Sequence, residues 1–243
     1  PYPVGSSFPQ AFFPGYFHEG GPEAMLAILN DEDKRAELIE RMSEISYTAP
    51  EGNVWTHIGE GGNQEFEGWL FDDLAKKWGV SVEEMMTRMM AETSLACGMR
   101  VAPPGNVRQW RQVEEDVMQL MARPDYMVGS DSIPVGGMPH PRAYGCFVRM
   151  VGRLRRRYNY PVEQVVQRMT QNPAERFGLT DRGVIAEGKF ADLVIFDEQN
   201  VNDRSSFEDP AVHPEGVPHV LVNGKLVVEN EQVTGVMAGH AIP

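Results

Sequence analysis

The spacing of hydrophobic positions changes near residue 179 of the chain. Before that point most apolar residues recur every three or four positions, which is typical of amphipathic helices, and short apolar runs between them indicate strands. After it, short apolar runs alternate with turn residues, as in antiparallel sheets. The pattern predicts helices that begin at or near Gly21, Asp33, Leu70, Ser81, Val113 and Pro161, and strands at Val54–Ile58, Cys97–Val101, Tyr126–Asp131, Asp192–Asp197, Val220–Val222 and Leu226–Val228.

Local signals support several of these boundaries. Pro22 suits a first helical turn, because its missing N–H would have no partner there. Ser81 followed by Glu84 forms a capping box, and Asn223-Gly224 between two apolar runs is the strongest short-range signal of a hairpin. Leu38, Met42 and Ile45 share one face of a predicted helix. On another helix, a methionine-rich stripe could line a ligand groove but is expected to lie in the core: Val82, Met85, Met86, Met89 and Met90.

Strand–helix alternation followed by hairpins predicts an α/β fold. The first part is expected to belong to an α/β barrel or a layered domain, and a small β domain is expected to begin near residue 179. A chain of 243 residues, 42% of them hydrophobic, is long enough for one sizeable core or for a larger and a smaller unit.

Charge, hydrophobic runs and cysteine content indicate which partners and which cellular compartment are expected. The net charge of -13 disfavours nucleic acid, because an acidic surface repels phosphates. No apolar run is long enough to cross a bilayer, and no charged-then-apolar leader signals secretion. Two cysteines favour a reducing, cytoplasmic compartment. The chain begins with proline and reads like the interior of a protein, so an incomplete or processed chain is expected.

The most informative segment runs from Gly129 to Arg142. Asp131 ends a predicted apolar strand, and in an α/β barrel such strand ends face the active site. A carboxylate there can bind a metal or take a proton from a metal-bound water, although aspartate also forms turns and helix caps. Arg142 follows Pro139-His140-Pro141, and its guanidinium can grip a carboxylate through two parallel hydrogen bonds. A cluster of arginines nearby is expected to form a solvated helix face: Arg153, Arg155, Arg156 and Arg157.

Several segments together resemble the amidohydrolase superfamily and, within it, the D-aminoacylase group. They are Pro1–Ser7, His18–Gly21, Gly129–Asp131, Pro139–Arg142, Asn172–Leu179, Asp181–Ile185, Gly188–Asp197, Phe207–Pro210, Glu215–Val217 and His219–Gly224. The resemblance implies the C-terminal half of such a protein. It implies the last part of a TIM-like (β/α) barrel with an inserted helical segment over residues 1–178, and part of a small β-sandwich domain over residues 179–243.

The same resemblance implies a function and site residues. The function is zinc-dependent hydrolysis of the amide bond of a small-molecule substrate, an N-acyl-D-amino acid. Asp131 would activate a metal-bound water and pass the proton to the leaving amine, while Arg142 and Ser6 would hold the substrate carboxylate. Asp131 is also the candidate metal ligand in this chain. The family's His-x-His pair, cysteine and two further histidines come from earlier barrel strands, and this sequence has no His-x-His pair.

The resemblance to half of a protein leads to two expectations for the chain by itself. One carboxylate cannot hold zinc tightly, because catalytic zinc usually has three protein ligands, so the chain by itself is expected to be inactive. Half a barrel exposes edge strands, so the isolated chain is expected to fold poorly or aggregate. Two other functions stay open: hydrolysis of a cyclic amide, as by hydantoinases or dihydroorotases, and a non-catalytic role as a half-barrel interaction protein.

Overall fold

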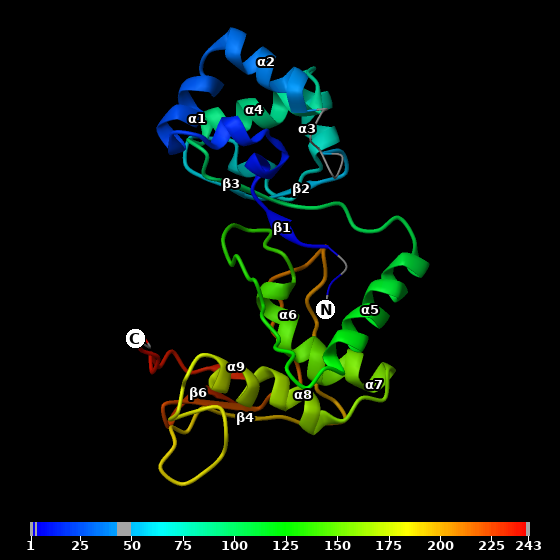
Figure 1. Cartoon of the computed structure of the whole chain (residues 1–243), viewed down its shortest axis with the longest axis vertical. Coiled ribbons are helices and arrows are strands. Elements are labelled where there is room, and N and C mark those ends of the chain that lie inside the picture. The colour runs from blue at the N-terminus through cyan, green and yellow to red at the C-terminus, as the bar shows by residue number, and fades with distance from the viewer. Residues whose placement is uncertain (1, 3, 43–49, 242–243) are drawn as a thin grey trace. The chain divides into compact units, whose positions relative to one another are not determined.

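The computed structural model describes residues 2, 4–42 and 50–241, and the chain divides into two compact units (Figure 1). Unit 1 holds the described residues among 1–3, 106–132 and 141–243, and unit 2 holds those among 4–105 and 133–140. Unit 2 is therefore built from one long segment, residues 4–105, and one short segment, residues 133–140. The predicted domain boundary at residue 179 falls within unit 1 and remains a prediction.

Unit 2 contains the first four helices, each close to its predicted position. They are α1 (Gly21–Leu29), α2 (Glu32–Met42), α3 (Phe71–Trp78) and α4 (Val82–Glu92), with 3-10 turns η1 (Pro9–Phe12), η2 (Gly15–His18) and η3 (Gln64–Phe66). The Ser81 hydroxyl accepts the N–H of Glu84 at 3.1 Å, as the capping box predicts. Helix α2 begins earlier than predicted, because Asp31 and not Asp33 accepts the N–H of Lys34, at 3.1 Å.

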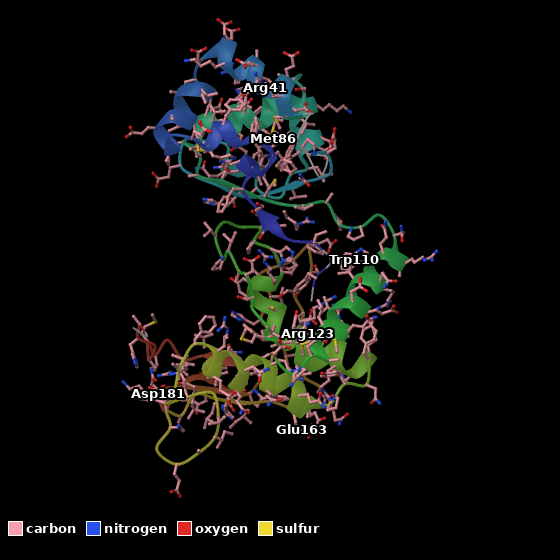
Figure 2. The ribbon with its side chains drawn as sticks, viewed as in Figure 1. Arg41, Met86, Trp110, Arg123, Glu163 and Asp181 are labelled. Atoms are coloured by element: carbon pink, nitrogen blue, oxygen red, sulfur yellow. The ribbon has the colours of Figure 1, made fainter. Side chains whose placement is uncertain are left out.

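A three-stranded antiparallel sheet completes unit 2. Its strands are β1 (Ser6–Ser7), β2 (Val54–Ile58) and β3 (Cys97–Arg100), in the order β1-β3-β2. The four helices lie on one side of β2 and β3 (Figure 1). Trp55 and Phe71 are stacked between them with ring centroids 4.3 Å apart. The predicted core role of the methionines is confirmed, because Met85, Met86, Met89 and Met90 are fully buried, and Figure 2 shows Met86 among the helices. Ile45 lies outside the described residues.

Unit 1 contains the remaining helices. They are α5 (Val107–Met121), α6 (Arg142–Arg149), the π-helical segment η4 (Met150–Leu154), α7 (Arg155–Arg157), α8 (Val162–Met169) and α9 (Gln171–Arg176). The predicted helices near Val113 and Pro161 are present. A helix was expected at the arginines from Arg153 to Arg157 and is present, but its start at Arg142 was not predicted, although Cys146, Met150 and Leu154 recur every four positions. Its buried side chains join a core with α5 and α8: Met118, Met121, Met150, Val151, Leu154, Val165 and Val201.

One arginine at the end of this helical run, Arg155, is less solvated than predicted. The Arg155 side chain is only 10% exposed, and its guanidinium lies 3.1 Å from the Glu198 carboxylate. Arg157 lies 2.5 Å from Glu114, which is itself buried. The prediction is wrong for Arg155, because an acidic residue distant in sequence approaches its guanidinium and replaces solvent, whereas Arg156 and Arg157 are exposed as predicted.

The last part of unit 1 is a four-stranded antiparallel sheet. Its strands are β4 (Leu193–Ile195), β5 (His219–Val222), β6 (Lys225–Glu229) and β7 (Gln232–Val233), in the order β4-β5-β6-β7. Asn223 and Gly224 connect β5 to β6 with φ angles of 49° and 77°, which is the left-handed geometry of a type I′ turn. The predicted hairpin is confirmed.

The predicted strand at Tyr126–Asp131 is not formed, and that prediction is wrong. The N–H of Val128 donates to the carbonyl oxygen of Arg168 at 3.0 Å, and the Asn172 side chain donates to that of Tyr126 at 2.8 Å. Helix residues thus satisfy backbone groups that a neighbouring strand would pair. Each strand pair within the described residues is antiparallel, and a parallel barrel sheet remains a prediction.

No helix within residues 2, 4–42 and 50–241 combines the length and the apolar character needed to span a bilayer.

Candidate active site

Asp131 and Arg142, both singled out from the sequence, are in direct contact in unit 1. A terminal nitrogen of Arg142, Nη2, lies 2.9 Å from Oδ2 of Asp131. The Asp131 side chain is 84% exposed, whereas that of Arg142 is 11% exposed. Asp131 has a φ angle of 48°, a left-handed conformation that aspartate tolerates better than most residues. The pair therefore combines a largely buried guanidinium with a carboxylate that projects into solvent.

The Pro-His-Pro-Arg motif determines where the helix carrying Arg142 begins. Helix formation is disfavoured for the residue before a proline, so His140 cannot easily extend the helix backwards from Pro141. The N–H groups of Tyr144 and Gly145 donate to the carbonyl oxygen of Pro141 at 3.2 and 2.9 Å, which closes the first turn. Arg142 is consequently the first residue of α6.

Tyr2 supports this first turn, a role that sequence reasoning did not identify. Its hydroxyl donates to the carbonyl oxygen of Pro141 at 3.4 Å, and the Arg149 guanidinium lies 4.7 Å from its ring centroid. Gly145 leaves room for Tyr2, because a Cβ there would lie 2.6 Å from the Tyr2 hydroxyl oxygen. Burial raises the pKa of Tyr2, so the hydroxyl stays a neutral donor at physiological pH.

A buried charge network anchors α6 two turns after Arg142. The Arg149 guanidinium lies 3.2 Å from Glu114 and 3.1 Å from Asp203, and all three side chains are at most 5% exposed. Burial raises the pKa of Asp203 despite the opposing charge of Arg149. Because a buried charge is costly without a partner, this network fixes the helix that carries Arg142 against α5.

Ser6, the third predicted site residue, belongs to β1 in unit 2, whereas Asp131 and Arg142 belong to unit 1. It pairs in register with Arg100 of β3. A cavity of about 230 Å³ borders Ser6 and is otherwise lined mainly by apolar groups. The other lining residues are Ser7, Phe8, Thr56, His57, Ala96, Cys97, Gly98, Ile133, Val135 and His140.

The two histidines of this cavity differ in their contacts. His140 is buried, and its Nε2 lies 3.0 Å from the carbonyl oxygen of Val4. Nδ1 of His57 lies 3.6 Å from Oε1 of Glu67. His140 thus connects neighbouring segments of unit 2, whereas Nδ1 of His57 is buried without a hydrogen-bond partner in the described structure.

The described residues contain no group of three His, Cys, Asp or Glu side chains placed to hold a metal. Asp131 has the donor chemistry that zinc accepts, since carboxylate oxygen is one of its usual ligands. Cys97 is buried, which raises the pKa of its thiol to about 12 and disfavours the thiolate that binds metals. Burial also raises the pKa of the Cys146 thiol. Neither cysteine is suited to a ligand role in this conformation.

Comparison with known proteins agrees with the resemblance found in the sequence. Residues 82–228, more than half of the chain, match the amidohydrolase family. The D-aminoacylase of Alcaligenes xylosoxydans xylosoxydans is 41% identical over 130 residues, which cover 53% of this chain and 27% of that protein.

Solved structures show the same relationship. A D-aminoacylase with a binuclear metal centre has a TM-score of 0.66 at 27% identity, covering 90% of this chain and 46% of that one. An N-acyl-D-glutamate deacylase from Bordetella bronchiseptica, solved with zinc and a phosphonate mimic of the tetrahedral intermediate, has a TM-score of 0.60 at 28% identity, covering 87% and 50%. The chain thus spans about half the length of these structures. It belongs to the amidohydrolase family, in which its relatives are D-aminoacylases and N-acyl-D-glutamate deacylases.

Proposed function

We propose that the intact protein containing these residues hydrolyses the amide bond of N-acyl-D-amino acids to a carboxylate and a free D-amino acid. The observation that carries the proposal is the ion pair between Asp131 and Arg142, which brings together a proton acceptor and a receptor for carboxylates. The relatives named D-aminoacylase and N-acyl-D-glutamate deacylase support it. Because the chain spans about half of such structures, the activity is assigned to the intact protein, and the 243 residues alone are proposed to be inactive.

Arg142 is proposed to bind the α-carboxylate of the substrate. Its guanidinium already binds one carboxylate, that of Asp131, and guanidinium groups hold carboxylates through charge-assisted hydrogen bonds. A substrate carboxylate is the same chemical group and can replace Asp131 there. That exchange would release Asp131 towards the reacting amide, so substrate binding and the availability of the base are coupled.

Asp131 is proposed to move the proton of the reaction. Its carboxylate accepts one proton from the attacking water and delivers it to the amide nitrogen as the C–N bond breaks. Zinc is the proposed cofactor, with Asp131 as its candidate ligand in this chain and further ligands from the part of the relatives' length that this chain does not span. When bound, zinc polarises a carbonyl and lowers the pKa of a water ligand.

Ser6 is proposed to hydrogen-bond the same substrate carboxylate as Arg142. Its position beside a small, mainly apolar cavity supports a role next to a substrate group, because ligand sites combine apolar walls with a few placed polar groups. The resemblance of Pro1–Ser7 to the D-aminoacylase group also supports this role of Ser6. Pro1 and Pro3 lie outside the described residues.

We also propose how the chain divides between two parts of the fold. Residues 1–178 are assigned to the end of a TIM-like barrel with an inserted helical segment, and residues 179–243 to part of a small β-sandwich domain. Support comes from the structural similarity to D-aminoacylases and from the antiparallel sheet of β4 to β7. A cytoplasmic location is proposed from the two cysteines, both of which are free thiols.

The proposed function is tested by assaying the intact protein on three substrates: N-acetyl-D-methionine, its L enantiomer and a hydantoin. We expect hydrolysis of the D substrate at a higher kcat/KM than either of the others. Hydrolysis of the hydantoin alone would instead indicate a cyclic amide hydrolase. Absence of hydrolysis on all three by zinc-loaded protein would favour a non-catalytic interaction protein.

A further inference from the structure

The segment Ile133–His140 joins Asp131 to Arg142 but packs within unit 2. Its main anchor is the carboxylate of Glu67, in the glycine-rich loop after β2. Oε2 of Glu67 accepts the N–H of Gly137 at 2.5 Å, and Oε1 accepts the N–H of Ile58 at 2.8 Å. One side chain therefore ties the middle of the connecting segment to the end of a core strand.

Close backbone packing reinforces this anchor. The N–H of Met138 donates to the carbonyl oxygen of Thr56 at 3.4 Å. Gly136 adopts a φ angle of 82°, and a Cβ on it would lie 2.4 Å from that same carbonyl oxygen. Gly136 is therefore needed both for its backbone conformation and for the close approach to β2.

The covalent connection makes this anchor relevant to the candidate active site. Ile133 lies two residues after Asp131, and His140 lies two residues before Arg142. Between them, Gly136 and Gly137 allow the backbone many conformations unless contacts select one. The hydrogen bonds of Glu67 supply that selection at the centre of the segment.

We propose that Glu67 is a positioning residue of the deacylase: its carboxylate fixes Ile133–His140 and thereby the placement of Asp131 and Arg142 at the two ends. The activity part of this inference rests on the proposed function. A carboxylate suits the task because it accepts two backbone N–H groups, one on each oxygen, through charge-assisted bonds. The amide of glutamine has only one acceptor oxygen.

The test compares Glu67→Gln and Glu67→Asp with Glu65→Gln, an exposed glutamate of the same loop, in the intact protein. Hydrogen exchange is measured over residues 133–140, and kinetics are measured on an N-acyl-D-amino acid. In Glu67→Gln we expect exchange at Gly137 to accelerate about tenfold or more, as for the loss of a hydrogen bond to a charged group. We expect kcat/KM to fall by a similar factor, while the protein still unfolds in one cooperative transition. Glu67→Asp should recover part of both, and Glu65→Gln should match the wild type.

Each outcome decides a separate point. Unchanged exchange in Glu67→Gln would overturn the anchoring role of Glu67. Faster exchange with unchanged kcat and KM would overturn its positioning role in the reaction. A wild-type protein that hydrolyses no N-acyl-D-amino acid would refute the proposed function, while the exchange data would still decide whether Glu67 holds the segment.

Discussion

Nη2 of Arg142 lies 2.9 Å from Oδ2 of Asp131, yet the two side chains differ sharply in exposure, 11% against 84%. The guanidinium is held within unit 1 at the start of α6, whereas the carboxylate extends into solvent. Exchange of the exposed partner is therefore the less costly change: another carboxylate can replace Asp131 without disturbing the helix. This asymmetry fits the proposed roles, in which Arg142 receives the substrate carboxylate and Asp131 moves the proton.

Replacing Asp131 by asparagine removes the proton acceptor but nearly preserves its shape. We expect kcat of the intact protein on N-acetyl-D-methionine to fall by about 10²–10⁴, the usual contribution of a general acid–base group. Asp125→Asn is the matched control, since Asp125 is an exposed aspartate earlier in the same connection and pairs with Arg123. An Asp131→Asn variant that retains the wild-type kcat would show that another group moves the proton.

The network around Arg149 should dominate the stability of the helix that carries Arg142. Arg149→Met removes the cation that buried Glu114 and Asp203 share. Glu114 keeps its contact with Arg157, so the loss falls mainly on Asp203, and we expect the free energy of unfolding to fall by about 3 kcal/mol. Arg153→Met is the control: its side chain is 39% exposed and lies 3.5 Å from Asp203, so the loss should be at most about 1 kcal/mol. Equal losses in denaturant titrations would contradict this ranking.

Burial of Cys97 predicts a loss of stability at alkaline pH. The pKa of the thiol is about 12 in the folded state against an ordinary value of 9.0, so between these pH values the unfolded chain releases a proton that the folded chain keeps. The stabilisation that the neutral Cys97 thiol gives the folded state is thus complete below pH 9. Above pH 9 the free energy of unfolding declines by roughly 1.4 kcal/mol per pH unit for this one group. We expect Cys97→Ala to show a shallower decline between pH 9 and 11. Identical slopes for the variant and the wild type would contradict the assignment.

Apolar side chains exposed in unit 1 should make the isolated 243-residue chain prone to self-association. Ile185 is 90% exposed, and Val194 and Ile195 of the edge strand β4 are 57% and 53% exposed. Exposed apolar patches and unprotected edge strands promote association. We expect the isolated chain to bind a hydrophobic dye and to elute from size-exclusion chromatography at an apparent mass above that of a monomer. The double variant Ile185→Lys and Val194→Lys should reduce both the dye signal and the apparent mass. A wild-type monomer that binds no dye would contradict this expectation.

Features encoded over a few residues were predicted from the sequence. The cap at Ser81 and the Asn223-Gly224 hairpin depend on neighbours within four positions, so their signals lie in one short window. The buried face of Met85 and Met86 follows from helical spacing alone. Asp131 and Arg142 were identified through the Pro-His-Pro-Arg motif and a family resemblance, and the structure places them in contact.

Features that depend on distant partners were not predicted. A strand at Tyr126–Asp131 requires a neighbouring strand, and in the described chain its backbone bonds to residues of α8 and α9 instead. Glu67 lies 70 residues from Gly137, so nothing in its own loop indicates the contact. Arg155 looked solvated because its partner, Glu198, is 43 residues away.

The proposed function depends most on whether Arg142 recognises the substrate carboxylate, which can be measured directly. Wild type, Arg142→Ala and the exposed-site control Arg108→Ala are compared in the intact protein on N-acetyl-D-methionine and on its α-carboxamide, which lacks the charge. We expect Arg142→Ala to lower kcat/KM for the acid by about 10²-fold or more, as for removal of a charge-assisted pair. We expect kcat/KM for the carboxamide to change little, and Arg108→Ala to change neither value. Equal losses on both substrates would contradict this recognition, because Arg142 would then act without reading the carboxylate.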